Sequence, residues 1–296
     1  MIPRGGDVVH SARSMYRTHR ANLEYQNPVL GATPPAPNKL PYWHVATATY
    51  ICCNDNMETN TSTVLDCICE RRAIRAFDPV EIPKEAREQI LNAACMAASS
   101  FNIQPYRFYW VESSEKLKEA ARLCFGQSPA ETASALIVAV ADIGSWSATT
   151  KRHLEWVRTA GFTDEQIAEY EKKAKLGKWF FIQGWFGIFG AIKWVILRAI
   201  HPWRTIGIAP VGRQGMFKWA IKSAGLASGN LMIAAQSLGF HTCPMEGFDD
   251  LRLGKFLGLN RRSHQIMMVI AIGKKSADHR DFPRWRRPLE DTVTVL

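Results

Sequence analysis

The sequence lacks the short motifs that mark several large classes of enzyme. It has no Gly-x-Gly-x-x-Gly, no Gly-x-x-x-x-Gly-Lys-Ser/Thr, no His-Glu-x-x-His and no Gly-x-Ser-x-Gly. These absences argue against a dinucleotide-binding fingerprint, a P-loop, a zinc protease and a serine hydrolase. The histidines are scattered without the spacing of metal ligands. We therefore expect surface or structural interior positions for four of them, His153, His201, His241 and His264.

Cysteine usage gives no sign of a disulfide framework or a metal site. The seven cysteines are odd in number and include no Cys-x-x-Cys pair. We therefore expect free thiols in a reducing cytoplasm. Cys67 and Cys69 are separated by one residue, which on a helix points them to different faces. Cys243 is expected to pack in the interior rather than to react.

The chain has enough apolar residues to bury a sizeable core. Its 296 residues are 47% hydrophobic, which suits one or two domains, and we expect one. Apolar periodicity predicts helices over 82–98, 115–123, 163–175 and 217–238, and strands over 107–111, 135–141 and 266–273. The unbroken apolar run over 135–141 indicates a strand buried on both faces. Thr163 is expected to cap its helix. Interleaved helices and strands indicate a mixed α and β class.

Residues 1–56 differ in character from the remainder of the chain. They contain the run Thr-Pro-Pro-Ala-Pro, no sustained amphipathic period and no apolar segment flanked as in a secretory signal. We expect little order there, and we take Met57 as the native start, preceded by a disordered or non-native extension. The folded domain is accordingly expected over 57–296.

Three arginines stand close together in the segment ERRAIRAFDP, residues 70–79. They are Arg71, Arg72 and Arg75. Each guanidinium offers five N–H donors in a planar fork that matches phosphate oxygens. We therefore interpret the segment as a binding site for a multiply charged anion, and a phosphate group is the preferred ligand. The alternative is a solvated basic face at a helix end, where cations also interact favourably with the helix dipole.

Three further segments carry groups suited to a flat, anionic ligand. SSFNIQP, residues 99–105, places small and amide side chains in a turn before a predicted strand. PMEGFD, residues 244–249, ends an apolar run in a turn where Gly247 allows the backbone to approach a flat ligand closely. FPRWRRP, residues 282–288, adds Arg284 and Arg286, which are able to close on the same phosphate.

These four segments, in this order, resemble the nitroreductase family of FMN-dependent oxidoreductases. ERRAIRAFD is similar to the family's Arg-Arg-Ser-x-Arg start, SSFNIQP to its Pro-Ser-x-x-Asn-x-Gln-Pro turn, and PMEGFD to the loop that faces the isoalloxazine ring. Two positions depart from the pattern: Ala73 stands where serine is common, and Ala98 where proline is usual. The missing Ser hydroxyl removes one possible hydrogen bond to the flavin, which bears on affinity more than on chemistry.

The resemblance implies a fold, a cofactor and a reaction. The fold is α+β, a three-layer sandwich with a central, mainly antiparallel sheet flanked by helices, dimeric with FMN at the interface. NADH or NADPH reduces the flavin, which then reduces an electron-poor nitroaromatic, quinone or enone in a ping-pong mechanism. No side chain is assigned to catalysis, because the flavin carries the chemistry. The residues implied in cofactor binding are Arg71, Arg72, Ala73, Arg75, Ser99, Ser100, Asn102, Gln127, Pro244, Met245, Glu246, Gly247, Arg284 and Arg286.

The resemblance does not explain a basic, tryptophan-rich insert at about 177–215. Its apolar part, 177–204, is interrupted by Lys193 and Arg198, which argues against a membrane-spanning helix. Residues 151–222 hold 13 Lys or Arg against 5 Asp or Glu, which is +8 of the chain's net +10. We weigh equally a peripheral contact of 177–204 with an anionic membrane surface and a cap over the active site or dimer interface. The tryptophans of this part are Trp179, Trp185, Trp194 and Trp203.

Two other functions within reach of the same motifs stay open. One is a flavin-dependent dehalogenase-like relative, and the other is a non-catalytic flavin-binding protein at a membrane surface. The Asn102–Gln104–Pro105 turn favours the general reductases. We expect no nucleic-acid partner, because no helix-turn-helix, zinc-finger or RNA-binding string accompanies the basic charge. The expected location is the cytoplasm, and the alternative is peripheral attachment to the inner face of a membrane.

Overall fold

The computed structural model describes residues 64–184, 187–205 and 210–296, which belong to one compact unit. The predicted extension 1–56, the predicted start at Met57, and Trp185 lie outside these residues. The elements, in chain order, are α2 (Val64–Glu70), β1 (Phe77–Asp78), α3 (Lys84–Cys95), η1 (Ser100–Asn102), β2 (Tyr106–Val111), α4 (Ser114–Leu123), α5 (Ser128–Thr132), β3 (Ala135–Asp142), α6 (Trp146–Thr159), α7 (Asp164–Phe181), α8 (Ile188–Ile200), α9 (Gly212–Ser237), β4 (His241–Met245), α10 (Asp250–Phe256), β5 (His264–Lys275) and η3 (Leu289–Asp291).

The five strands form one antiparallel sheet. The strand order is β1-β5-β3-β2, and β4 also pairs with β5. Strand β3 pairs along its length with both β5 and β2, and all eight of its residues are buried. This confirms the predicted strand buried on both faces. One isolated bridge, between Ala73 and Thr242, is parallel and ties the arginine segment to the start of β4.

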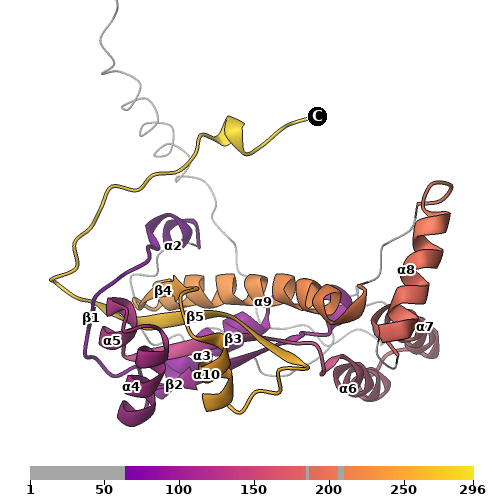
Figure 1. The fold of residues 1–296 in the computed structure, drawn as a ribbon, viewed down its shortest axis with the longest axis horizontal. Helices are drawn as coiled ribbons and strands as arrows, with labels where there is room; N and C mark the ends of the chain where they lie inside the picture. Colours follow the sequence, from indigo (N-terminus) through magenta and orange to yellow (C-terminus); the bar gives the residue numbers. More distant parts are fainter. Residues whose placement is uncertain (1–63, 185–186, 206–209) are drawn as a thin grey trace, which may run out of the picture. The chain divides into compact units, whose positions relative to one another are not determined.

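Helices cover both faces of the sheet and make three layers (Figure 1). Side chains of β3 alternate between two core clusters, because successive residues of a strand point to opposite faces. Leu136, Val138 and Val140 join the cluster that includes residues of α4, α5 and α10. Ala135 and Ile137 join the cluster that includes residues of α3 and α9. The predicted three-layer α+β sandwich is therefore confirmed.

Every helix and strand predicted from periodicity is present, although several boundaries differ: α3 covers 84–95 rather than 82–98, and α9 begins at Gly212 rather than at residue 217. Helix α7 continues to Phe181, six residues beyond the predicted end. Gly177, inside the added part of this helix, is buried, with the ring of Phe101 3.7 Å from the place of a Cβ atom. Thr163 caps α7 as predicted: its Oγ1 accepts from Gln166 N, and Gln166 Oε1 accepts from Thr163 N at 2.9 Å.

The insert at 177–215 does not form a separate unit. It starts in the last turns of α7, contains α8 and ends in the first turn of α9. Helices α6, α7 and α8 lie together beyond one end of the sheet (Figure 1). Within the described residues no helix is both long and apolar enough to cross a membrane.

The described cysteines occupy the positions expected of structural thiols. On α2, Cys67 is buried and Cys69 is exposed, which confirms that they lie on different faces. Cys243 is buried in the core cluster under α4, α5 and α10. Burial raises the pKa of the Cys243 thiol, although Arg75 and Arg71 act against this. A raised pKa keeps the thiol protonated and unreactive.

Candidate functional site

An open cavity of about 460 Å³ lies between the segment that follows α2 and the C-terminal segment that follows β5. Its lining includes six of the residues that the sequence nominated for cofactor binding. They are Arg71, Arg72, Ala73, Arg75, Arg284 and Arg286. Tertiary structure therefore brings both predicted arginine clusters to one place, although more than 200 residues separate them along the chain. We refer to this place as the arginine cavity.

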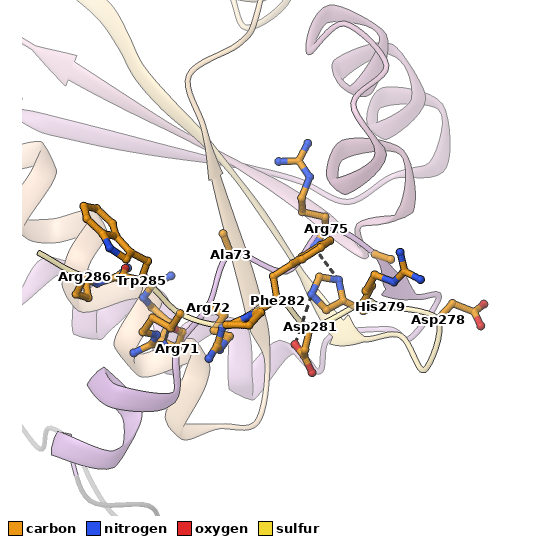
Figure 2. A pocket seen from close by; sticks show the side chains of 14 residues that line it. Arg71, Arg72, Ala73, Arg75, Asp278, His279, Asp281, Phe282, Trp285 and Arg286 are labelled. Atoms are coloured by element: carbon orange, nitrogen blue, oxygen red, sulfur yellow. Dashed lines mark hydrogen bonds and ion pairs between the residues drawn. The ribbon is translucent and has the colours of Figure 1, made fainter. Parts of the chain in front are cut away.

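Hydrogen bonds from guanidinium groups to backbone carbonyls join the two segments that line the arginine cavity. Arg284 Nη2 donates to the backbone oxygen of Arg71 at 2.6 Å. In the reverse direction, Arg72 Nη1 donates to the backbone oxygen of Phe282 at 2.7 Å. Figure 2 shows Arg71, Arg72 and Arg286 gathered on one side of the cavity. The C-terminal segment is thus positioned by the same side chains that line the cavity.

Arg75 is oriented differently from its neighbours. Its side chain points to the opposite side of the segment from Arg71 and Arg72 (Figure 2). Its backbone is fixed on both sides: the Arg75 N–H donates to His279 Nδ1 at 3.3 Å, and its carbonyl accepts from Ser128 Oγ at 2.8 Å. The first residue of α5 therefore holds Arg75 at the rim of the cavity.

The arginine cavity has an excess of positive charge. Within the described residues, no ion pair joins Arg71, Arg72, Arg75, Arg284 or Arg286 to a carboxylate, and Asp281 is paired instead with Lys275 and His279. Burial lowers the pKa of Arg71, and repulsion from Arg284 and Arg286 lowers it further. Among the residues that the structure describes, Arg71 Nη1 is also buried without a hydrogen-bond partner. Buried donors are normally satisfied, so this orphaned N–H indicates a place for an anionic acceptor.

A second group of predicted residues lies at the end of β4. The backbone N–H of Ile74 donates to Thr242 O at 3.1 Å, so the arginine segment runs beside β4 and its loop. Gln127 Nε2 donates to Gly247 O at 2.7 Å and to Cys124 O at 3.0 Å. The structure therefore brings Gln127 and the loop together, and Gln127 adjoins the Ser128 that holds Arg75.

The side chains of this loop differ in what they can contact. Met245 is buried in the core, so only its backbone is available to a ligand. Glu246 and Gly247 are exposed. A Cβ atom on Gly247 would lie 3.0 Å from Gln127 Nε2, so the glycine allows the close contact between loop and amide. Pro244 is half-buried on β4.

The turn at 99–104 has a strained backbone. Phe101, Asn102 and Gln104 have φ angles of 56°, 53° and 50°, in the left-handed region that residues other than glycine rarely adopt. Such conformations cost about 1–3 kcal/mol each and cluster at functional sites. Ser99 Oγ accepts from Gln104 N at 3.0 Å, and Gln104 Nε2 donates to Asn102 Oδ1 at 3.1 Å, which helps to hold the turn.

The strained turn presents its polar residues to solvent and lies apart from the arginine cavity. Ser100 and Asn102 are exposed, and Ser99 is half-buried. None of the three lines the cavity. Phe101 packs against Phe181 of α7 with ring centroids 5.8 Å apart. Within the described unit, the nominated residues therefore fall into two sets, one around the cavity and β4, the other in this turn.

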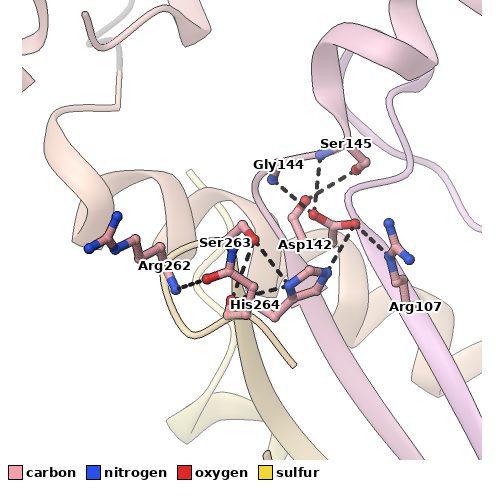
Figure 3. Close-up of polar contacts among 8 residues, drawn as sticks. Arg107, Asp142, Gly144, Ser145, Arg262, Ser263 and His264 are labelled. Carbon is pink, nitrogen blue, oxygen red and sulfur yellow. Dashed lines mark hydrogen bonds and ion pairs between the residues drawn. The ribbon is translucent and has the colours of Figure 1, made fainter. Parts of the chain in front are cut away.

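Sequence reasoning missed one buried polar cluster, centred on Asp142 at the end of β3 (Figure 3). Asp142 Oδ2 accepts from Arg107 Nε at 2.6 Å, and Oδ1 accepts from the backbone N–H groups of Gly144 and Ser145 at 2.8 and 3.1 Å. The hydrogen bond to Asp142 raises the pKa of Arg107. His264 Nε2 lies 3.6 Å from Oδ2, and the His264 side chain is 15% exposed.

The Asp142 cluster joins β2, β3, β5 and the approach to α6 next to the strained turn. The Asp142 N–H donates to Pro105 O at 3.0 Å, directly after Gln104. The only signal in the sequence was a carboxylate at the end of an otherwise apolar strand, Ala135–Asp142. Its contacts hold the end of β3 to β2 and to the backbone that leads into α6.

The pattern of the Nitroreductase family matches residues 68–274, which is more than half of the chain. The chain belongs to the nitroreductase family. YdgI of Bacillus subtilis, which carries an NAD(P)H nitroreductase name, is 29% identical over 79% of this chain and 97% of its own. The protein DrgA of Synechocystis is 30% identical over 72% of this chain and 84% of its own. These matches confirm the resemblance and identify the chain as an NAD(P)H-dependent oxidoreductase.

Solved nitroreductase structures share the fold. A structure of this type from Exiguobacterium sibiricum, in complex with FMN, superposes with a TM-score of 0.61 at 23% identity. It covers 80% of this chain and 99% of its own. At this identity the likeness concerns the fold alone.

Proposed function

We propose that this nitroreductase is an FMN-dependent enzyme that passes hydride from NADH or NADPH to an electron-poor acceptor in a ping-pong mechanism. The acceptor class is a nitroaromatic, a quinone or an enone. The enzyme works in the cytoplasm as a homodimer with flavin at the subunit interface. The observation that carries the proposal is the arginine cavity, in which Arg71 Nη1 is buried without a hydrogen-bond partner in the described part of the chain.

The residues present fit FMN on chemical grounds. A flavin phosphate is a dianion with several acceptor oxygens, and guanidinium groups bind such oxygens through charge-assisted hydrogen bonds. Arg284 and Arg286 both repel the charge of Arg71, and a phosphate bound between them would relieve that repulsion. Ala73 lacks the hydroxyl common in the family, so more of the phosphate affinity falls on the arginines. The FMN found in the Exiguobacterium sibiricum structure supports the same cofactor here.

FMN, when bound, would supply the hydride-transfer chemistry. The protein's own residues would bind and orient. Arg71, Arg284 and Arg286 hold the phosphate end. Gln127 fixes the carbonyl of Gly247 at 2.7 Å, which holds the loop backbone in one orientation toward the flat part of the ligand.

The strained turn supports the homodimer. Asn102 and the Ser99–Ser100 pair do not line the arginine cavity of their own chain, yet Asn102 and its neighbours Phe101 and Gln104 are held in left-handed backbone conformations, which cluster at functional sites. We propose that the turn of a second copy completes each site. Each site would then use the arginines of one chain and Asn102 of the other.

An anaerobic absorbance titration tests the reaction. The purified protein, loaded with FMN, should lose its flavin absorbance on addition of NADH or NADPH and recover it with a nitroaromatic or a quinone. Flavin that binds but is not bleached by either nucleotide would indicate a non-catalytic flavin protein and would overturn the proposal.

An arginine variant tests the site separately from the reaction. Arg71→Ala removes a charge-assisted donor worth about 1.5–3 kcal/mol, so we expect FMN to bind roughly 10–150-fold more weakly. The matched control is Arg261→Ala, an exposed arginine elsewhere on the surface. Equal FMN affinity for the two variants would show that the arginine cavity is not the phosphate site.

Mixed dimers test the shared site. Arg71→Ala and Asn102→Ala chains, each with low flavin content alone, are co-expressed with different tags and purified as heterodimers. If each site uses two chains, one intact site is restored in every heterodimer. No recovery of flavin binding would place both residues in a site of one chain.

A further inference from the structure

Helix α8 is apolar on nearly its whole circumference, and only one narrow side is covered. Gly190, Lys193 and Leu197 are its buried residues. The large apolar residues on its other sides are between 39% and 58% exposed, and Trp203, shortly after the helix, is 81% exposed. Surface helices usually pair an apolar stripe with a polar face, so an exposed surface of this kind indicates a binding partner. We call these residues the α8 surface: Ile188, Phe189, Ile192, Trp194, Val195, Ile196 and Ile200.

The orientation of α8 is fixed by a buried lysine. Lys193 Nζ donates to the backbone oxygens of Trp179, Phe180 and Ile182 at 2.9, 3.0 and 2.6 Å. Carbonyl groups at the end of a helix have no partners within that helix, so the ammonium group caps α7 and secures α8 to it. Rotating α8 to bury its apolar side chains against α7 would break these three hydrogen bonds. The α8 surface is therefore held facing outward.

The chain segment that contains α8 carries charges of one sign. Between Glu171 and Glu246 the chain contains ten Lys or Arg and no Asp or Glu. Lys178, Arg198 and Arg204 are exposed, and none of them takes part in an ion pair within the described residues. The partner of this region must therefore tolerate or attract positive charge.

We propose that α8 docks on an anionic lipid surface and lies in the plane of the membrane, with the α8 surface among the lipid headgroups and upper acyl chains. A basic helix with exposed Trp, Phe and Ile side chains has the chemistry of an interfacial helix. Its 13 residues are too few to cross the hydrocarbon core. This docking goes beyond the proposed oxidoreductase activity and does not depend on it.

Charge favours lipid over a second copy of this chain. In a two-fold interface the same surface meets itself, so Lys178, Arg198 and Arg204 of two copies would be brought together. The segment between Glu171 and Glu246 contains no Asp or Glu to offset these charges. Like charges that face each other across an interface oppose association. An anionic leaflet supplies the missing negative charge and attracts basic side chains near its surface.

Co-sedimentation with vesicles tests the docking. The full-length, flavin-loaded protein is mixed with vesicles of phosphatidylcholine alone or of phosphatidylcholine with phosphatidylglycerol. We expect binding to the anionic vesicles, weaker binding at higher salt, and little binding to the neutral ones. Ile192→Glu and Val195→Glu, at two exposed positions of α8, should each reduce partitioning more than tenfold. Arg198→Gln should reduce it about fivefold.

The matched control is Leu251→Glu on α10, because Leu251 is 54% exposed and lies outside the insert. It should bind vesicles as the unmodified protein does. The proposal is overturned if the unmodified protein stays in the supernatant with anionic vesicles at low salt, or if Leu251→Glu has the same effect as Val195→Glu. It is also overturned if Val195→Glu turns a dimer into monomers in the absence of lipid, since a second copy would then cover α8.

The two proposals fail separately. Flavin content and bleaching by NADH or NADPH should be unchanged in Ile192→Glu and Val195→Glu, because neither residue lines the arginine cavity. Thermal unfolding of both variants shows whether α8 still packs on α7. Loss of vesicle binding by a folded, reducible enzyme supports the docking, and absence of binding in an active enzyme refutes the docking alone.

Discussion

Replacing Asp142 should destabilise the protein far more than replacing an exposed carboxylate whose ion pair is about as short. The Asp142 side chain is 2% exposed and accepts from Arg107 at 2.6 Å. Glu119 and Arg122 on α4 form a pair of similar length, 2.7 Å, but both are substantially exposed. Solvent screens an exposed pair, and such pairs contribute little to stability. Burial rather than distance should decide the outcome.

The magnitude follows from the groups that Asp142→Ala leaves behind. Removing one partner of a buried pair costs about 3–5 kcal/mol, and Arg107 is 54% exposed, which favours the lower end because its charge regains some hydration. The N–H groups of Gly144 and Ser145 also lose their acceptor. We expect a loss of about 3 kcal/mol, which lowers the melting temperature by roughly 6–12 °C for a unit of this size.

Asp142→Asn separates the charge from the backbone contacts. Its amide oxygen can still accept from Gly144 and Ser145, so we expect about half the loss of Asp142→Ala. Glu119→Gln is the matched control and should leave the melting temperature unchanged. All variants are compared by circular dichroism at one protein and flavin concentration, since bound ligand also shifts the transition. If Asp142→Asn and Glu119→Gln behaved alike, the argument from burial would be wrong.

Three further predictions concern α6, α7 and α8. Thr163→Ala removes a capping box and should cost about 1 kcal/mol, whereas Ser113→Ala, at an N-cap without a side-chain hydrogen bond, should change thermal stability little; equal effects would contradict the capping argument. Burial lowers the pKa of His153 below its usual 6.5, so as pH falls this histidine is protonated in the unfolded state before it is protonated in the folded state. The contribution of the neutral histidine to the free energy of unfolding is therefore fully present above pH 6.5 and is lost as pH falls through the folded pKa. A pH series of melting temperatures should be flatter for His153→Phe, which keeps an aromatic ring beside Trp156, and an unchanged slope would exclude His153 as the cause. Lys193→Met leaves three backbone carbonyls without their donor and should speed protease cleavage between α7 and α9, whereas Lys178→Met should not. Identical digestion of the two variants would show that Lys193 does not secure α8 to α7.

Much of the fold was predictable because apolar periodicity reflects burial directly. The run over 135–141 indicated a strand covered on both sides, and the structure has such a strand between β2 and β5. Boundaries were harder where a single contact overrides local preference. The predicted end of α7 at residue 175 was wrong, because the helix continues through Gly177, whose small size lets Phe101 pack against it. The short elements β1, β4 and α5 carry too few residues for a periodic signal.

The candidate site was only partly predictable. The arginines near residues 71 and 284 could be assigned to one ligand through the family pattern, and they do line one cavity. The direction of the Arg75 side chain, the contact of Gln127 with Gly247 and the three left-handed residues of the turn have no sequence signal of their own. They depend on how distant segments pack.

The sequence alone determined which chemistry was available. Arginine spacing indicated an anion, the order of four motifs indicated a nitroreductase, and the acid-free stretch between Glu171 and Glu246 gave the region around α8 its positive charge. These properties belong to residue types and their spacing, and no folding is needed to read them. Tertiary structure alone decided which of those groups meet. Only packing left Arg71 Nη1 buried without a hydrogen-bond partner among the described residues, and only packing buried Asp142 beside Arg107. Packing also turned the apolar residues of α8 outward by securing Lys193 to α7. The physical reason is that burial and hydrogen bonding depend on neighbours far apart in the chain, which local sequence does not encode.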